Sequence, residues 1–350
     1  MKTGLALLVA ALTVAAAQQP AAPAFDAATK TQVIDGAIDH MRRAYIFADV
    51  AEKMAEALRA HESARAYEAI TTPREFAEAL TKHLQGVSRD KHLRIIYAPD
   101  GFPQRAAPTA ADRTRALAEE RRRNFGFQRV ERLDGNVGYI ELLGFSGSEE
   151  VAEAAVPAMN FLANADALIF DLRRNGGGSP LTIGLLSSYL FDEVVHLNDF
   201  YIRETDTRRE FFTKATVEGR KFGATKPVYV LTSNRTFSAA EEFTYNLKNL
   251  KRATIVGETT GGGAHPGGVR RITEQFGIWL PNGRAINPIT KTNWEGVGIE
   301  PDIKATAPEA LRAAHLAALK KIRETATEPR HREELDRAIA ALEKAAATQL

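Results

Sequence analysis

The feature that most restricts the fold of this chain is an alternation of apolar strand-like runs with helix-like runs in its middle. Four runs have the length and composition of buried strands: VGYIEL (137–142), ALIFDLR (167–173), PVYVLT (227–232) and ATIVGE (253–258). Helix-like runs separate them, at residues 149–163, 181–190 and 239–250. Nearly continuous apolar strands that alternate with helices are typical of a mostly parallel sheet covered on both faces.

Helical patterns flank this central region. Asp26 is the expected N-cap of a helix that extends to about residue 47, and a second periodic run covers residues 50–60. Thr72 and Pro73 predict the start of a third helix, because proline is favoured in the first helical turn. HLRIIY (92–97) then alternates like a strand, and residues 308–350 have the alanine, glutamate, lysine and arginine content of helices.

One short stretch predicts a hairpin. In FGIWLPNGRAI (276–286), two apolar runs flank Asn282 and Gly283, a dipeptide that is favoured in two-residue β-hairpin turns.

The N-terminal residues predict export. Lys2 precedes an apolar run at residues 5–14 that is too short to span a bilayer, and three alanines at 15–17 fit a cleavage site. We expect a signal peptide at 1–17, a tether at 18–25 and a periplasmic or extracellular protein with no membrane span after cleavage. The chain has no cysteine, so it contains no disulfide in any compartment.

Length and charge limit the remaining organisation and the partners. A chain of 350 residues is too long for one small hydrophobic core. After the tether we expect three further segments. These are an N-terminal helical domain at 26–110 that ends in the strand carrying His92, a core at 111–307 and a C-terminal helical extension at 308–350. A net charge of only +2 gives no footprint for nucleic acid or for a membrane surface.

Four stretches at the ends of predicted strands carry residues suited to chemistry. They are DLRRNGGGSP (171–180), LTSNRTFSAAEEF (231–243), GETTGGGAHP (257–266) and WEGVGIEPDI (294–303). The glycines of the first stretch would let backbone amides approach a ligand closely, as in an oxyanion hole or a phosphate cradle. The lysine of a P-loop is absent from it. In the third stretch, His265 is either a base or an ordinary loop histidine.

Ser238 allows two interpretations from its position alone. With Glu241 it matches a capping box, in which the two side chains satisfy the first amides of a helix. A serine at a strand-to-helix turn also has the position of a nucleophile elbow, where the next amide, that of Ala239, stabilises an oxyanion. The flanking glycines of the common elbow motif are replaced by Thr236 and Ala240.

The four stretches, in this order and spacing, resemble the tail-specific (C-terminal processing) serine peptidase family. The similarity is greatest to the branch that contains interphotoreceptor retinoid-binding protein and the tricorn protease core. This resemblance implies an α/β crotonase-like/ClpP-like spiral core, and acyl transfer through a serine without a cofactor or metal. A recognisable PDZ insertion is missing, so recognition of substrate C-termini is not implied.

The resemblance also implies roles for individual residues. Ser238 matches the nucleophile, His92 the base and Glu295 its charge partner, while the amides of Gly177 and Ala239 match the oxyanion hole. Gly263 stands where the C-terminal processing branch has its lysine, so a Ser-Lys dyad is not expected. Further expected site residues are Glu241 and His265 as auxiliary groups, with His265 the rival base, and Gly262 and Gly263 at the substrate.

The expected function is therefore hydrolysis of peptide bonds in a peptide or protein substrate by an exported serine peptidase, through an acyl-enzyme on Ser238. The alternative is a catalytically silent binding protein for an apolar ligand or peptide on the same fold, because a fold does not fix a function. The C-terminal helices allow oligomerisation as well as packing on their own core.

Overall fold

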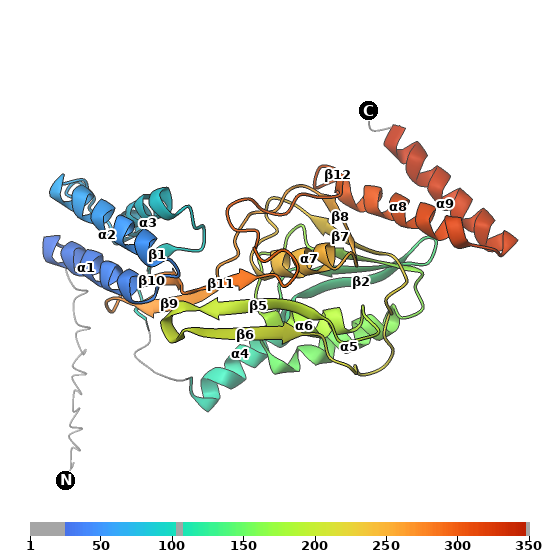
Figure 1. Ribbon diagram of the computed structural model, residues 1–350, viewed down its shortest axis with the longest axis horizontal. Helices are drawn as coiled ribbons and strands as arrows, with labels where there is room; N and C mark the ends of the chain where they lie inside the picture. Colours follow the sequence, from blue (N-terminus) through green and yellow to red (C-terminus); the bar gives the residue numbers. More distant parts are fainter. Residues whose placement is uncertain (1–24, 103–107, 348–350) are drawn as a thin grey trace, which may run out of the picture.

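The computed structural model describes residues 25–102 and 108–347. The molecule is elongated, with helices α1 to α3 at one end and α8 and α9 at the other (Figure 1). The predicted signal peptide and all of the predicted tether except Phe25 lie outside the described residues.

The described chain contains nine α-helices and twelve β-strands, besides three short 3₁₀ turns. The helices are α1 (Ala27–Ala44), α2 (Ala48–Ser63), α3 (Pro73–Ser88), α4 (Ala110–Arg122), α5 (Ala152–Phe161), α6 (Pro180–Ser188), α7 (Ala239–Asn249), α8 (Ala310–Thr325) and α9 (Pro329–Ala347). The strands are β1 (Arg94–Tyr97), β2 (Phe127–Leu133), β3 (Val137–Leu142), β4 (Ala167–Asp171), β5 (His196–Ile202), β6 (Thr207–Phe212), β7 (Val228–Thr232), β8 (Thr254–Gly257), β9 (Gly267–Arg271), β10 (Phe276–Pro281), β11 (Gly283–Ile286) and β12 (Ile303–Lys304).

The central sheet has six strands in the order β12-β8-β7-β4-β3-β2. All neighbours are parallel except β2 and β3, which confirms the prediction of a mostly parallel sheet. Phe170 of β4 packs on Phe243 of α7 in a core that α5 and α6 extend, whereas Ile169 faces the core formed with α8. Successive side chains of a strand point to opposite faces, so helices cover both sides of the sheet.

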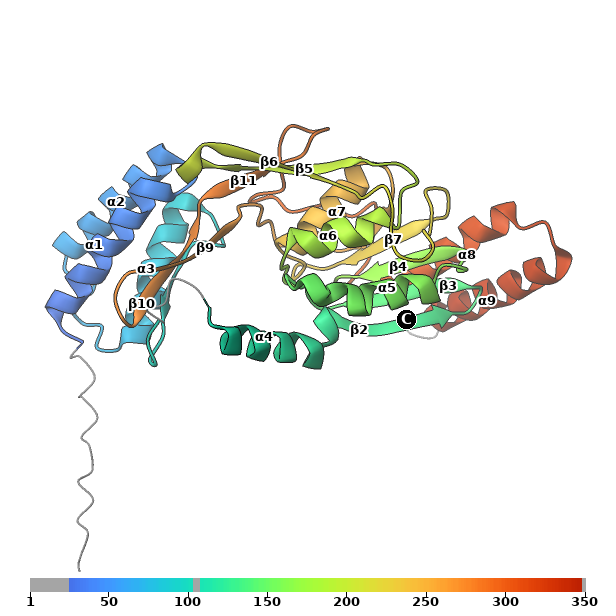
Figure 2. The ribbon, with the colours of Figure 1, turned by 90° about the horizontal axis from the view of Figure 1, so that it is seen from below.

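The N-terminal helices pack against a second, three-stranded sheet of order β1-β10-β9. The helix starts agree with the predictions: Asp26 accepts a hydrogen bond from the amide of Thr29 at 2.8 Å, and Thr72 precedes Pro73 at the first position of α3. Figure 2 shows β9 and β10 beside α1 and α3, although α3 ends at residue 88 and β9 begins only at residue 267.

The predicted hairpin at residues 276–286 is wrong. β10 pairs with β1 and β9, while β11 pairs with β5 in a third sheet of order β11-β5-β6. The backbone at Asn282 and Gly283 thus carries the chain from one sheet into another, and both amides donate to the carbonyl of Pro266. Each strand finds a partner from a distant segment, which short-range turn preferences do not reveal.

Two further observations concern the position of His92 and the character of the helices. β1 begins at Arg94, so His92 lies in the turn before the strand rather than within it, which corrects the predicted placement. Within residues 25–102 and 108–347, none of the helices combines the length and the apolar character needed to cross a membrane.

Candidate active site

Ser238 occupies the turn between β7 and α7 in a backbone conformation that an ordinary helix cap does not have. Its φ and ψ are 55° and −121°, whereas the cap residue Asp26 is extended, at −110° and −177°. A positive φ is costly for a residue with a side chain and persists only where the surroundings impose it. The capping-box arrangement with Glu241 is also present, so Ser238 ends the turn and starts the helix in a strained elbow.

Hydrogen bonds to α7 and to the stretch after β4 hold this elbow in place. The amide of Ser238 donates to the carboxylate of Glu241 at 2.9 Å, and the amide of Phe237 donates to the carbonyl of Asn175 at 3.1 Å. The hydroxyl of Thr236 donates to the carbonyl of Leu172 at 2.8 Å. The turn is therefore anchored to the glycine-rich stretch after β4.

Ser238 borders a cavity of about 210 Å³, here called the Ser238 cavity. Its lining includes Ala239 and Glu242 of α7, Gly178 of the first glycine-rich stretch, and His265 of the second. Phe200, Trp279 and Trp294 add aromatic walls. The cavity thus joins a serine, a histidine and backbone amides at the start of a helix.

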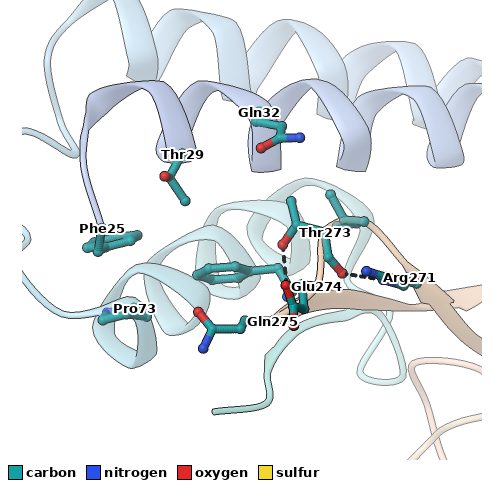
Figure 3. A pocket seen from close by; sticks show the side chains of 10 residues that line it. Phe25, Thr29, Gln32, Pro73, Arg271, Thr273, Glu274 and Gln275 are labelled. Carbon is teal, nitrogen blue, oxygen red and sulfur yellow. Dashed lines mark hydrogen bonds between the residues drawn. The ribbon is translucent and has the colours of Figure 1, made fainter. Parts of the chain in front are cut away.

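A larger hollow of about 580 Å³ lies elsewhere, between α1 and the connection from β9 to β10 (Figure 3). Phe25, Thr29, Glu274 and Gln275 are among the side chains around it. It includes neither a serine nor a histidine, so it lacks the groups that acyl transfer needs.

The backbone donors beside Ser238 differ from the sequence prediction at one position. The amide of Gly177 donates to the side-chain oxygen of Asn175 at 2.9 Å, so it is already engaged and does not support a role in the oxyanion hole. Gly178 lies opposite Phe145 in an isolated parallel bridge. The amide of Phe145 donates to the carbonyl of Gly177, and the amide of Ser179 donates to the carbonyl of Phe145, so the bridge does not use the amide of Gly178. Among the described residues, the amides of Gly178 and Ala239 have no acceptor, and both residues line the Ser238 cavity.

Gly177 instead contributes by lacking a side chain. A Cβ at this residue would lie 2.7 Å from Cβ of Ser238 and 3.0 Å from the amide nitrogen of Ala239. The close approach of the two backbones explains why the chain has glycine here, at a φ of 111°.

The two glycines predicted to bind substrate are also occupied. The amides of Gly262 and Gly263 donate to the carboxylate of Glu241 at 2.7 and 2.8 Å, and the hydroxyl of Thr260 adds a third donor at 2.5 Å. Burial raises the pKa of Glu241, while these hydrogen bonds oppose the rise. Glu241 therefore fixes the glycine-rich loop to the elbow, and this arrangement does not support substrate binding through these two amides.

His265, which the sequence analysis gave as the rival base, is held by carboxylates. Its Nδ1 lies 2.8 Å from Asp90 Oδ2 and 3.5 Å from Glu295 Oε2. A carboxylate beside Nδ1 keeps the proton on that nitrogen and leaves Nε2 as the basic one. Phe47 packs its ring edge-on against the imidazole, with the centroids 5.4 Å apart. His265 therefore has the surroundings of an oriented base at the Ser238 cavity.

His92 lies close to the elbow but is differently placed. Its ring centroid is 4.6 Å from that of Phe237 and 4.9 Å from that of Trp279. Nδ1 is buried and has no hydrogen-bond partner among the described residues. Burial lowers the pKa of His92 to about 4, so the ring is neutral at neutral pH.

Glu295 contacts His265 rather than His92. One carboxylate oxygen accepts the amide of Ala264, and the other is buried with no partner in the described part of the chain. Burial raises the pKa of Glu295 to about 7; the charge of His265 opposes this rise and that of Asp90 adds to it. Within the described ranges, no hydrogen bond joins Ser238 to His92 or to His265, and no hydrogen bond or ion pair joins His92 to Glu295. The predicted partnership of His92 with Ser238 and Glu295 therefore remains a prediction.

Asp90 is the residue that the sequence analysis missed. Its Oδ1 accepts the amide of His92 at 3.0 Å, whereas Oδ2, which faces His265, also accepts the hydroxyl of Tyr45 at 3.3 Å. In sequence it looks like an ordinary turn residue, and only the fold brings it to a histidine 175 positions later.

Asp90, His265 and Glu295 could also hold a divalent metal, because their ligand atoms lie within 4.8 Å of one another. A second such group, His196, Asp199 and Glu210, lies on β5 and β6. There Asp199 already pairs with Arg208, which competes with a cation. In the first group, a metal on Nδ1 would have to replace the proton shared with Asp90.

Comparison with known proteins identifies related families. The profile of peptidase family S41 matches residues 136–305, and the profile of the N-terminal domain of this family in eukaryotic IRBP matches residues 24–125. Carboxyl-terminal-processing peptidase 2, chloroplastic, of Arabidopsis thaliana is 28% identical over 221 residues, which are 60% of this chain and 41% of that protein. The chain thus spans about two fifths of the length of this curated relative.

Solved structures share the fold. A candidate peptidase from Parabacteroides merdae aligns with a TM-score of 0.58 and 18% identity, over 85% of this chain and 99% of that chain. The photosystem II D1 C-terminal processing protease aligns with a TM-score of 0.52 and 15% identity, over 80% and 94% of the two chains. At these identities, the likeness concerns the fold.

Proposed function

Because this chain belongs to peptidase family S41, we propose that it is a serine peptidase that cleaves peptide bonds through an acyl-enzyme on Ser238. The strained elbow at Ser238, which opens on a cavity shared with His265, is the observation that carries the proposal. A cap alone would not require a positive φ or a neighbouring oriented imidazole.

The groups around the Ser238 cavity support a complete sequence of steps. His265 Nε2 takes the proton of the Ser238 hydroxyl while the oxygen attacks the substrate carbonyl carbon. The amides of Ala239 and Gly178 donate to the oxyanion, and Asp90 stabilises the imidazolium. Collapse breaks the C–N bond, and the leaving amine takes the proton from His265. Water, deprotonated by the same histidine, then attacks the ester carbon, and His265 returns the proton to the Ser238 oxygen as the ester C–O bond breaks.

The choice of base rests on geometry. His265 lines the Ser238 cavity and has a carboxylate on Nδ1, whereas His92 has an unpartnered Nδ1 and a pKa near 4. A base works best with a pKa near the operating pH, which disfavours His92 in this conformation. The family resemblance gives the competing pair, His92 with Glu295.

Labelling with a fluorophosphonate tests the proposal. We expect the wild-type protein to be labelled and Ser238→Ala to remain unlabelled. His265→Ala should slow labelling by about 10² to 10⁴-fold, and His92→Ala should slow it much less. If only His92→Ala abolished labelling, the base would be His92, with Glu295 as its partner. A folded wild-type protein that resists the probe would contradict the peptidase and favour the silent binding protein.

We also propose that the protein is exported, which rests on the leader-like residues 1–17. Fractionation of cells that produce the full chain should place a form shortened by these residues outside the cytoplasm. Recovery of the full-length chain in the cytoplasm would contradict export.

A further inference from the structure

Glu242 is a buried acid in the wall of the Ser238 cavity for which the proposed mechanism has no use. It is the fourth residue of α7, which begins directly after Ser238, and both residues line the Ser238 cavity. Its side chain is only 3% exposed, yet it belongs to the cavity lining. A carboxyl group therefore stands about one helical turn from the nucleophile.

No basic residue neutralises this acid. Within residues 25–102 and 108–347, Glu242 forms no ion pair with lysine, arginine or histidine. Its polar neighbour is the amide of Asn198 on β5. Asn198 is fully buried, and neither polar atom of its side chain has a hydrogen-bond partner among the described residues. The wall of the cavity thus contains an acid that has no basic partner among the described residues.

Such an arrangement is unfavourable for the empty protein. Burial raises the pKa of Glu242 to about 8, and Asn198 opposes this rise only in part. Buried polar groups without partners cost free energy of folding, and buried acids with shifted pKa values cluster at functional sites. A ligand that supplied the missing partner would recover this free energy.

The walls of the cavity indicate the form of that ligand. Phe200, two residues after Asn198 on β5, lines it together with Trp279 and Trp294. Aromatic faces accept the methylene stem of a long side chain and attract a cation. The volume of about 210 Å³ exceeds that of a few water molecules and leaves room for a long side chain.

We propose that the Ser238 cavity binds the substrate side chain on the amino side of the cleaved bond, and that Glu242 selects arginine or lysine there. This inference rests on the proposed function, because that side chain leaves the carbonyl attacked by Ser238. The cation forms a charge-assisted hydrogen bond with the carboxylate of Glu242, which lines the cavity. A neutral side chain leaves the acid unpaired, and an acidic one adds a like charge.

The test compares peptides that differ at one side chain. Full-length wild-type protein is given fluorogenic peptides with arginine, lysine, citrulline or norleucine before the cleaved bond. Citrulline has the shape of arginine without its charge, so the ratio of kcat/KM for the two isolates the charge. We expect arginine to exceed citrulline by at least about 30-fold, as for a buried charge pair that loses one partner.

Glu242→Gln should bring the arginine-to-citrulline ratio close to one, whatever its absolute rate. Glu300→Gln, at an exposed glutamate, is the matched control and should keep the wild-type ratio. Equal rates for arginine and citrulline in the wild type would overturn the inference, and that comparison needs no variant to fold. If Glu242→Gln still preferred arginine over citrulline, a group other than Glu242 would cause the preference. Cleavage that persists in Ser238→Ala would instead contradict the proposed function.

Discussion

Gly177→Ala adds one methyl group beside Ser238 and removes none of the proposed catalytic groups. The new Cβ would lie 2.7 Å from Cβ of Ser238, 2.9 Å from the carbonyl oxygen of Phe237 and 3.0 Å from the amide nitrogen of Ala239. Real Cβ atoms essentially never approach other atoms within 3.0 Å. Two of these neighbours are backbone atoms that cannot rotate away, so either the glycine-rich turn or the elbow must move.

Two magnitudes follow from this clash. Alanine at a φ of 111° is strained, which costs about 1–3 kcal/mol of stability and leaves a typical domain folded. A displacement of about 1 Å at a nucleophile costs about 10²-fold in rate. We therefore expect fluorophosphonate labelling of Ser238 to slow by about 10²-fold while the protein remains folded.

The assay measures the second-order labelling rate together with urea unfolding. Gly176→Ala is the matched control, because a Cβ there meets nothing within 4 Å and the residue has no positive φ. It should keep the wild-type labelling rate and a free energy of unfolding within about 0.5 kcal/mol. If Gly177→Ala were labelled at the wild-type rate, the two backbones would not be in contact, and the assigned elbow geometry would be refuted.

Three further predictions concern charge and capping. Asp90→Asn should slow labelling by up to about 10⁴-fold, because an amide lets His265 adopt the wrong tautomer, and an unchanged rate would exclude Asp90 as its orienting partner. The pKa of Glu242 is about 8 in the folded protein against an ordinary 4.5, so folding favours the protonated carboxyl. The contribution of Glu242 to the free energy of unfolding is therefore complete below pH 4.5 and is lost as the pH rises through 8. Urea unfolding of Glu242→Gln should be less sensitive to pH in this window, and an unaltered slope would contradict the assignment. Asp26→Ala should lower the free energy of unfolding by about 1 kcal/mol through loss of the cap of α1, without changing the labelling rate, and unchanged stability would contradict the capping role.

Local patterns in the sequence determined most of the elements. The apolar runs at β3, β4, β7 and β8 and the intervening helices were predicted within a few residues, because periodicity and capping depend on neighbours along the chain. The turn that carries Ser238 was visible for the same reason. The sequence also made Ser238 ambiguous between cap and nucleophile, and the backbone conformation in the structure is what distinguishes it from an ordinary cap.

Only the tertiary structure decided which distant residues meet. β10 and β11 separate into different sheets although Asn282 and Gly283 favour a hairpin, because each strand gains a longer-range partner. Asp90 reaches His265, and Glu242 reaches Asn198, across segments that no short-range rule connects. Hydrogen bonds within a turn depend on adjacent residues, whereas the pairing of strands and the burial of charged side chains depend on the whole packed chain. For that reason the sequence indicated Ser238 as a candidate nucleophile, whereas the fold determined that His265 and Glu242 line the same cavity and that Asp90 lies beside His265.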